Sequence, residues 1–225
     1  MTNTTAIQTT TITFPEIKLQ RRDAHKLRGY FGRLFQEHSE LLHNHFENGG
    51  LKYGYSMIQY KIVDNVPMLM GFGEGARLLT QLFLDIHELN IDGRIYPVFA
   101  KNIEARTWHI GLSNRLTTYH FDSLWMALNE RNHDLYKTYE PEQQLDQLRG
   151  IAVQNILAFF TAFDLRLPEN QRVMLELVDI KEHQTTFKNT QMKAFAGKLV
   201  TNATLPDLMG IGKSVSRGFG VLRRR

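Results

Sequence analysis

Near its C-terminal end the sequence reads Met209-Gly210-Ile211-Gly212-Lys213-Ser214-Val215-Ser216-Arg217-Gly218-Phe219-Gly220. Two Gly-x-Gly pairs enclose a short segment that contains Lys213, Ser214, Ser216 and Arg217. Glycine lets a backbone turn tightly and approach a ligand closely, while amides, hydroxyls and cations point at that ligand. This segment, which we call the glycine loop (residues 209–220), therefore has the chemistry of a phosphate-binding loop.

Two common nucleotide-binding motifs do not fit the glycine loop. A Walker A loop that ends in Gly212-Lys213-Ser214 requires glycine at position 207, where the sequence has Asp207. The dinucleotide-binding fingerprint would need its third glycine at Val215 or at Arg223. Only five residues follow Gly220, too few for the helix and strand that either fold would add. The loop therefore indicates a polymer of phosphates, and we expect no nucleotide cofactor.

Positive charge is concentrated near the two ends of the chain. The whole sequence of 225 residues has a formal net charge of +4. Residues 205–225 alone carry +4, from five cations and one aspartate, and residues 18–36 carry +5, from six cations and one aspartate. Residues 37–204 sum to −4. Two basic segments in an otherwise acidic chain indicate one anionic partner that both segments contact.

The composition is that of a globular protein. Hydrophobic residues make up 42% and charged residues 22% of the chain, which is ordinary for a folded protein. No segment approaches the ~20 uninterrupted apolar residues of a membrane span, and the first residues have no apolar signal core. The sequence has no cysteine, which excludes disulfides and thiolate zinc sites. We expect a cytoplasmic protein without a membrane segment.

The first half of the chain predicts a ferredoxin-like unit, in which the elements follow the order strand, helix, strand, strand, helix, strand. Alternating and helical hydrophobic patterns mark these elements. They are a strand at 11–17, a helix at 21–37, strands at 57–63 and 66–72, a helix at 74–89, and further strand at 96–100 and 105–112. Asp64-Asn65, between two of the strands, is a two-residue hairpin signal.

The same order then recurs incompletely. The patterns predict a strand at 119–128, a helix at 141–163, and strands at 172–180 and 195–200. Only a short polar stretch and the glycine loop occupy the place of the second helix, and Val221-Leu222 follows as a short strand. We therefore expect an α+β protein of two tandem ferredoxin-like (RRM-like) domains, the second without a regular second helix. We place these domains at 1–115 and 116–225.

The predicted helix at 21–37 has one apolar and one basic face. Leu27 and Phe31 belong to the apolar stripe, whereas Arg22, Lys26 and Arg33 lie on the other side. We expect the apolar side to pack on a sheet. The basic side is suited to a row of phosphates.

His43 and His45 lie in a polar segment just beyond this helix, and Lys52 follows them. RNA carries its own nucleophile, the 2′-hydroxyl, so a protein that moves two protons and stabilises the phosphate can cut it without metal. Histidine suits the proton transfers because its ordinary pKa is about 6.5, and lysine suits the anionic transition state. Tyr30 lies on the apolar stripe of the helix, either as a core residue or with its hydroxyl aimed at the histidines.

Two other interpretations of the histidines stay open. A two-histidine metal site would need further ligands, and loop histidines also make ordinary hydrogen bonds. The metal-dependent nucleases that are named after a His-Asn-His motif have these three residues spread over a ββα unit. The adjacent tripeptide at 43–45 therefore does not indicate that class.

Several segments resemble one protein family. The glycine loop resembles the C-terminal glycine-rich loop of the CRISPR-associated endoribonucleases that cut precursor CRISPR RNA within its repeats, members of the repeat-associated mysterious protein superfamily. Segments of the bacterial branch of that family are similar to Leu42-His43-Asn44-His45, Ile58-Gln59-Tyr60-Lys61 and Trp125-Met126-Ala127-Leu128-Asn129. These segments lie in both halves, so the resemblance covers nearly the whole chain.

The resemblance implies a fold, a site and a reaction. Two ferredoxin-like domains would lie side by side, with RNA across the cleft and against the glycine loop. Cleavage without metal would leave a 2′,3′-cyclic phosphate and a 5′-hydroxyl. The catalytic histidine of the family falls by position on His45, with His43 as the alternative, and Tyr30 and Lys52 match catalytic residues of some members.

The expected partner is CRISPR repeat RNA, as precursor and as product. The residues expected to bind it are Arg22, Lys26, Arg33, Gly210, Gly212, Lys213, Ser214, Ser216, Arg217, Gly218 and Gly220. The sequence leaves open whether the protein forms a homodimer or works with subunits of an effector complex. The alternative functions are a non-catalytic repeat-RNA-binding subunit of such a complex and a metal-dependent nuclease.

Overall fold

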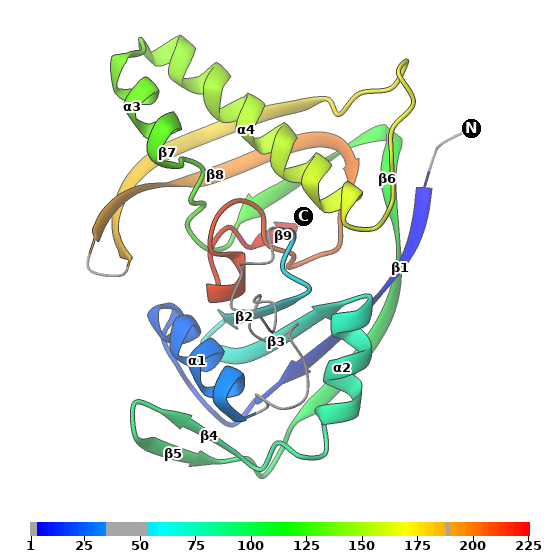
Figure 1. Cartoon of the computed structure of the whole chain (residues 1–225), viewed down its shortest axis with the longest axis vertical. Coiled ribbons are helices and arrows are strands. Elements are labelled where there is room, and N and C mark those ends of the chain that lie inside the picture. The colour runs from blue at the N-terminus through cyan, green and yellow to red at the C-terminus, as the bar shows by residue number, and fades with distance from the viewer. Residues whose placement is uncertain (1–3, 35–53, 188–189) are drawn as a thin grey trace, which may run out of the picture. The chain divides into compact units, whose positions relative to one another are not determined.

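The computed structural model describes residues 4–34, 54–187 and 190–225. These residues form two compact units, drawn in Figure 1. The N-terminal unit comprises Ala6–Trp108 together with Val215–Gly218. The C-terminal unit comprises His109–Ser214 and Phe219–Arg225, together with residues 4 and 5.

The N-terminal unit is built in the predicted order. Its elements are β1 (Thr4–Thr13), the 3-10 turn η1 (Arg21–Asp23), α1 (Ala24–Leu34), β2 (Ile58–Val63), β3 (Val66–Phe72), α2 (Glu74–Leu82) and the first part of β6 (Asn102–Phe121). The strands follow the order β2-β3-β1-β6 in the sheet. The last strand of the βαββαβ unit thus lies beside the first, as in a ferredoxin-like fold.

Helices α1 and α2 pack on one face of this sheet (Figure 1). Leu27 and Phe31 of α1 and Leu79 of α2 share a buried core with Tyr60 and Leu69, which are paired across β2 and β3. Each fully buried side chain of this kind contributes about 1.5–3 kcal/mol relative to exposure. The apolar stripe predicted for the helix at 21–37 therefore packs on a sheet, as expected.

The predicted hairpin between β2 and β3 is present. Asp64 and Asn65 have φ of 51° and 64°, and Val63 pairs with Val66. Two successive positive φ angles are typical of the primed turns that match the twist of antiparallel strands.

The predicted helix at 74–89 is too long. α2 ends at Leu82, and β4 (Glu88–Ile91) pairs with β5 (Arg94–Pro97) in a separate two-stranded sheet. Ile86 is buried, but it lies between α2 and β4 in the chain. The turn at Asp92-Gly93 has positive φ at both residues and allows the hairpin to form. Hydrophobic period alone does not separate a short strand from the end of a helix.

The C-terminal unit repeats the arrangement. Its elements are the remainder of β6, α3 (Glu130–Thr138), α4 (Pro141–Thr161), β7 (Leu175–Phe187), β8 (Thr190–Thr204) and β9 (Leu222–Arg224). The strand order is β9-β6-β8-β7, so the last strand again pairs with the first. The expectation of an α+β fold with tandem ferredoxin-like units is confirmed, although α3 was not predicted.

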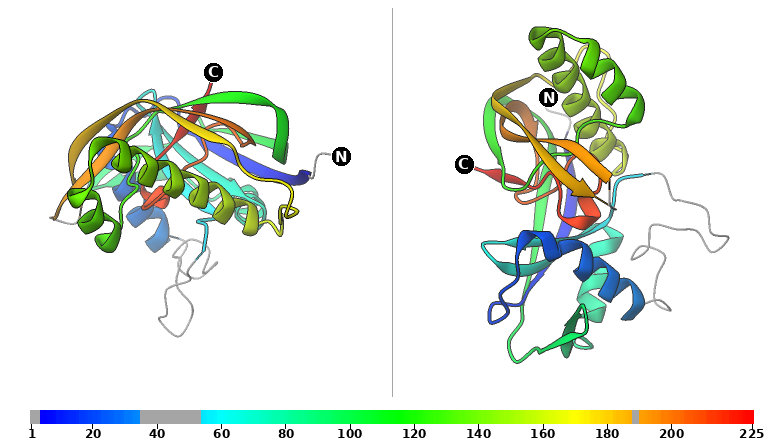
Figure 2. Two further views of the ribbon diagram at one scale, coloured as in Figure 1. Left: turned by 90° about the horizontal axis from the view of Figure 1, so that it is seen from above. Right: turned by 90° about the vertical axis from the view of Figure 1, so that its left-hand side faces the viewer.

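Helix α4 covers the sheet of its own unit and lies against β7, as two views in Figure 2 show. It begins with Pro141 at its first turn and a capping box between Glu140 and Gln143. Its buried residues include Leu148, Ala152 and Ile156, spaced along one stripe. Within the described ranges, no helix is long and apolar enough to cross a membrane.

Between β8 and β9, where every residue is described, the chain forms the glycine loop and the 3-10 turn η3 (Val215–Arg217). The predicted absence of a regular second helix is therefore confirmed. The boundary predicted between residues 115 and 116 falls inside β6, which contributes residues 102–108 to the N-terminal unit and residues 109–121 to the C-terminal unit.

Candidate nucleic-acid interface

The proposed catalytic segment lies between α1 and β2. The structure describes the chain up to Leu34 and again from Gly54, so His43, His45 and Lys52 lie outside the described residues. Their catalytic roles remain predictions from the sequence. The elements on both sides of this segment belong to the N-terminal unit.

Tyr30 has a structural partner in the N-terminal unit. Its side chain is 8% exposed, and its hydroxyl donates a hydrogen bond to the Glu88 carbonyl oxygen in β4 at 2.8 Å. Burial raises the pKa of Tyr30, as does the Glu88 carboxylate, so the phenol keeps its proton. The hydroxyl thus joins α1 to the β4–β5 hairpin, and of the two alternatives expected for Tyr30 this bond favours the core residue over a hydroxyl aimed at the histidines.

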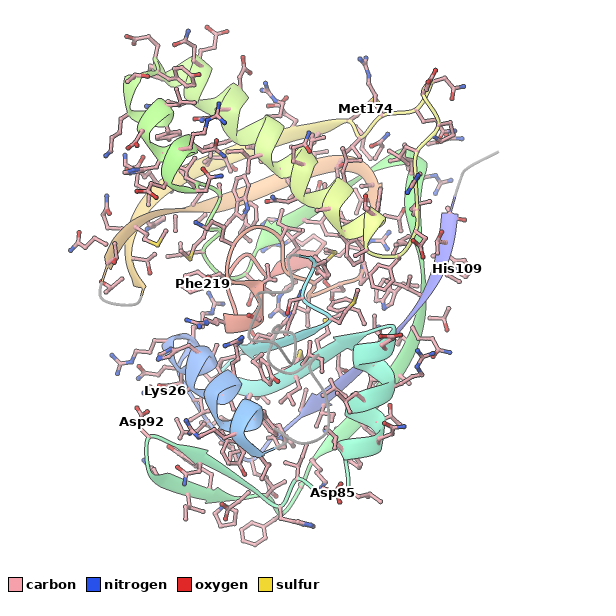
Figure 3. The ribbon with its side chains drawn as sticks, viewed as in Figure 1. Lys26, Asp85, Asp92, His109, Met174 and Phe219 are labelled. Carbon is pink, nitrogen blue, oxygen red and sulfur yellow. The ribbon has the colours of Figure 1, made fainter. Side chains whose placement is uncertain are left out.

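The cations on α1 and the preceding turn differ in their surroundings. Lys26 forms ion pairs with Asp23 at 2.7 Å and with Asp92 at 2.6 Å, and Figure 3 shows Lys26 beside Asp92. Both carboxylates raise the pKa of Lys26, Asp23 most strongly. Arg22 and Arg33 are exposed. Lys26 therefore keeps its charge but is paired with two carboxylates, which weakens the expectation that it binds a phosphate.

Several amides of the glycine loop are already hydrogen-bonded within the protein. The Ile211 amide donates to Gly220, the Lys213 amide to Met126, the Gly218 amide to Val215 and the Gly220 amide to Leu124, with distances of 3.0, 2.9, 3.2 and 2.9 Å to the carbonyl oxygens. Each amide has one proton, and in these groups that proton is already directed at a carbonyl oxygen of the protein. These internal bonds make the four amides weaker candidates for RNA contacts than the side chains of the loop.

Two glycines of the loop are required by close packing. Gly212 has φ of +87°, and a Cβ atom there would lie 2.6 Å from the indole nitrogen of Trp125. Gly218 has φ of +83°, and a Cβ atom there would lie 2.7 Å from the Cβ of Ala24. Both positions combine a left-handed backbone with contact to a distant part of the chain. These glycines fix the path of the loop, and between them Lys213 is exposed while Val215 is buried.

The middle of the glycine loop belongs to the N-terminal unit. Residues 215–218 pack against both α1 and β2. This packing brings Arg217 near Arg28 of α1, one of the six cations in residues 18–36. The expectation that cations from both basic segments come together therefore holds for this pair of arginines. Only the tertiary packing of η3 on α1 distinguishes Arg28 from the other cations of the helix.

Burial and charge both act on Arg217. Burial lowers the pKa of its guanidinium, and the positive charge of Arg28 lowers it further. Burial also raises the pKa of Tyr60, 1% exposed on β2, against the opposing effect of Arg28. The charge of Arg28 thus acts on a residue of β2 as well as on Arg217.

The exposed polar side chains of the glycine loop are further candidates for phosphate contacts. Lys213 is exposed, and Ser214, Ser216 and Arg217 are partly exposed. Guanidinium and ammonium groups bind phosphate oxygens through charge-assisted hydrogen bonds, and hydroxyls add neutral ones. Among the residues that the structure describes, no group of three or more histidine or carboxylate side chains could hold a metal ion. These side chains have the chemistry of phosphate ligands.

Both halves of the chain match family models. Residues 5–109 match the Cas6b N-terminal domain, and residues 111–225 match the Cas6b C-terminal domain. The chain belongs to the Cas6b family. The family resemblance seen in the glycine loop and the histidine segment is thereby confirmed.

Relatives of this Cas6b chain include one sequence and two solved structures. The "Uncharacterized protein MJ0978" of Methanocaldococcus jannaschii is 30% identical over 144 residues, which cover 64% of the Cas6b chain and 97% of that protein. A structure described as "Crystal structure of Cas6b" is 30% identical with a TM-score of 0.92. Another, described as "Crystal structure of CRISPR RNA processing endoribonuclease Cas6b", is 27% identical with a TM-score of 0.79. Each structural match covers 98% of the Cas6b chain and 100% of the other chain.

Proposed function

We propose that this chain is an endoribonuclease that cuts CRISPR repeat RNA to produce mature guide RNAs. The observation that carries the proposal is that the middle of the glycine loop, which contains Arg217, packs against α1. Helix α1 is the element that precedes the histidine segment in the sequence. Membership of the Cas6b family supports it, as does the similarity over nearly the whole chain to a protein described as a CRISPR RNA processing endoribonuclease.

The proposed chemistry uses the RNA's own 2′-hydroxyl. That oxygen attacks the adjacent phosphorus while the 5′-oxygen leaves, so the products carry a 2′,3′-cyclic phosphate and a 5′-hydroxyl. His45 acts as general base or general acid, with His43 as the alternative, since one proton leaves the 2′-oxygen and another must reach the 5′-oxygen. Lys52 stabilises the negative charge on the phosphate, and no metal takes part.

The proposed RNA contacts follow the cations of the N-terminal unit and the glycine loop. Arg22, Arg33, Lys213 and Arg217 bind backbone phosphates, and the hydroxyls of Ser214 and Ser216 donate further hydrogen bonds. Tyr30 is assigned to the structure of the unit because its hydroxyl proton is engaged by Glu88.

One experiment separates the proposed function from its alternatives. Labelled repeat RNA is incubated with the wild type, His43→Ala and His45→Ala, with and without EDTA, beside a substrate that carries a 2′-deoxyribose at the cut. We expect cleavage that withstands EDTA and is lost with the deoxy substrate and with at least one histidine variant.

Each alternative predicts a different result. Binding of the repeat RNA without cleavage would identify a non-catalytic RNA-binding subunit. Loss of cleavage in EDTA would identify a metal-dependent nuclease. Cleavage of the deoxy substrate would contradict attack by the 2′-hydroxyl.

A further inference from the structure

Because Lys26 is engaged in two ion pairs, another cation of α1 is better placed to bind a phosphate. Lys26 is held between Asp23 and Asp92, so a phosphate would have to compete with two carboxylates for it. Arg28 lies one turn beyond Ala24, and residues four apart on a helix are neighbours on the same face. Ala24 is the residue against which Gly218 packs. Arg28 therefore lies on the side of α1 that meets the glycine loop.

The fold holds Arg28 and Arg217 together although both are cations. Gly218 approaches Ala24 so closely that no larger residue fits there, and its neighbour Arg217 is partly buried beside α1 and β2. Arg28 is close enough for its charge to disfavour the ionised form of Arg217. Like charges brought together in a partly buried place destabilise each other. An anion shared by the two guanidinium groups would reverse that effect.

Guanidinium groups suit such an anion when it is a phosphate. Each group offers a planar fork of N–H donors that matches two phosphate oxygens, and arginine stays charged even where burial lowers its pKa. A phosphodiester has two non-bridging oxygens that two guanidinium groups can share. The pair is therefore better suited to an RNA backbone than to a neutral ligand.

We infer that Arg28 and Arg217 together bind one backbone phosphate of the repeat RNA, an inference that rests on the proposed function. This phosphate lies at the start of α1, where the glycine loop packs on the helix. The shared phosphate couples the two basic segments of the sequence. Arg28 thereby takes the phosphate-binding role predicted for Lys26.

The test measures binding of labelled repeat RNA that carries a 2′-deoxyribose at the cut, so that cleavage does not interfere. Arg28→Ala and Arg217→Ala should each raise Kd about tenfold or more, because charge-assisted hydrogen bonds are among the stronger contacts. The double variant should raise Kd by less than the product of the single effects, since both arginines act on one phosphate. Arg28→Lys and Arg217→Lys should raise Kd by less than the alanine variants, because they keep the charge and lose the fork.

Arg77→Ala is the matched control. Arg77 is an arginine of the same unit, lies on α2 and is 69% exposed. Thermal unfolding of every variant shows whether the fold is kept, and the lysine variants carry the test if an alanine variant does not fold.

The outcomes distinguish this inference from the proposed function. Binding by either alanine variant as tight as that of Arg77→Ala would overturn the inference, and so would a double-variant effect equal to the product. In both cases the wild type would still bind and cut the RNA. A wild-type protein that neither binds nor cuts repeat RNA would instead refute the proposed function.

Discussion

Two tyrosine hydroxyls of the N-terminal unit are buried but differ in their partners. The Tyr30 hydroxyl donates to the Glu88 carbonyl oxygen, whereas the Tyr60 hydroxyl has no hydrogen-bond partner among the described residues. A buried hydroxyl with a partner stabilises a fold modestly, and one without a partner costs free energy. The two tyrosines therefore give opposite expectations when each is replaced by phenylalanine.

Tyr30→Phe is expected to lower the free energy of unfolding by about 1 kcal/mol, because it removes the bond to Glu88. Single-turnover cleavage of bound RNA, measured well below the unfolding temperature, should change by less than about threefold, against the 10²–10⁴-fold that a lost acid–base group costs. Urea unfolding and rapid-quench kinetics provide the two measurements. A hundredfold fall in the cleavage rate with unchanged RNA affinity would show that Tyr30 has a catalytic role.

Tyr60→Phe is expected to leave the free energy of unfolding unchanged or to raise it by up to about 1 kcal/mol. The substitution removes a buried hydroxyl that finds no partner and keeps the ring that stacks near Phe31. Urea unfolding beside Tyr30→Phe gives the comparison. Marked destabilisation would mean that the hydroxyl has a partner.

At the scale of elements, the glycine loop is positioned by contacts with distant residues. Its Gly212 lies against Trp125, which itself donates a hydrogen bond to Asn155 of α4 at 3.2 Å. The loop thus depends on the core of the C-terminal unit for its path. Its middle depends on α1 through Gly218 and Ala24.

Gly212→Ala is expected to destabilise the protein by roughly 1–3 kcal/mol, because alanine must adopt a positive φ and meets the Trp125 ring. Gly150→Ala in α4 is the matched control, since no atom lies within 4 Å of its added Cβ. That control should stabilise the protein by about 0.5–1 kcal/mol because glycine is unfavourable in a helix interior. Thermal unfolding compares the two, and equal effects of both substitutions would contradict the packing argument.

The start of α1 makes stability depend on pH through Asp23. Burial acts to raise the pKa of Asp23, but Lys26, the Gln20 amide and Arg22 outweigh it and hold the pKa below its ordinary value of 3.8. The unfolded chain then binds the proton more readily, so this stabilisation is present above pH 3.8 and is lost as pH falls through the lower folded pKa.

Asp23→Asn tests this dependence because it removes the negative charge but keeps a side-chain oxygen. In the wild type the Gln20 amide donates a hydrogen bond to Asp23 Oδ2 at 3.1 Å, and the asparagine oxygen can accept the same bond. The wild type should be more stable than the variant at pH 6, and the difference should shrink as pH falls toward 3. Urea unfolding across this range measures it. A difference independent of pH would show that the charge of Asp23 has no role.

At the scale of the whole molecule, binding should be governed by charge. Cations that neutralise RNA phosphates release counterions, so log Kd should rise linearly with log salt concentration, by about 0.7 for each contact with a single strand. Removing Arg28 and Arg217 together should reduce this slope by about 0.7, the value for one phosphate contact, and Arg77→Ala should leave it unchanged. Filter binding at several salt concentrations measures the slope. Affinity that does not vary with salt would contradict a phosphate-binding surface.

Local pattern was sufficient for most elements of the fold. The hairpin at Asp64-Asn65, the amphipathic stripe of α1 and the long helix α4 all follow from residues that are near one another in sequence. The missing second helix was also predictable, because glycine and proline exclude a regular helix there. The end of α2 was not, since the strand pairing of β4 with β5 overrides its helical pattern.

The sequence by itself determined the order of elements, the two basic segments and the family resemblance, because each depends on neighbouring residues. Only the tertiary structure decided which polar side chains have partners within the protein and which are placed to contact RNA. Tyr30 finds Glu88 at a separation of 58 residues, Lys26 finds Asp92 on the hairpin, and Arg28 meets Arg217 from the far end of the chain. A side chain's partner depends on which distant segments the topology brings together. Periodicity along the chain reports only on neighbouring residues and therefore does not predict such partners.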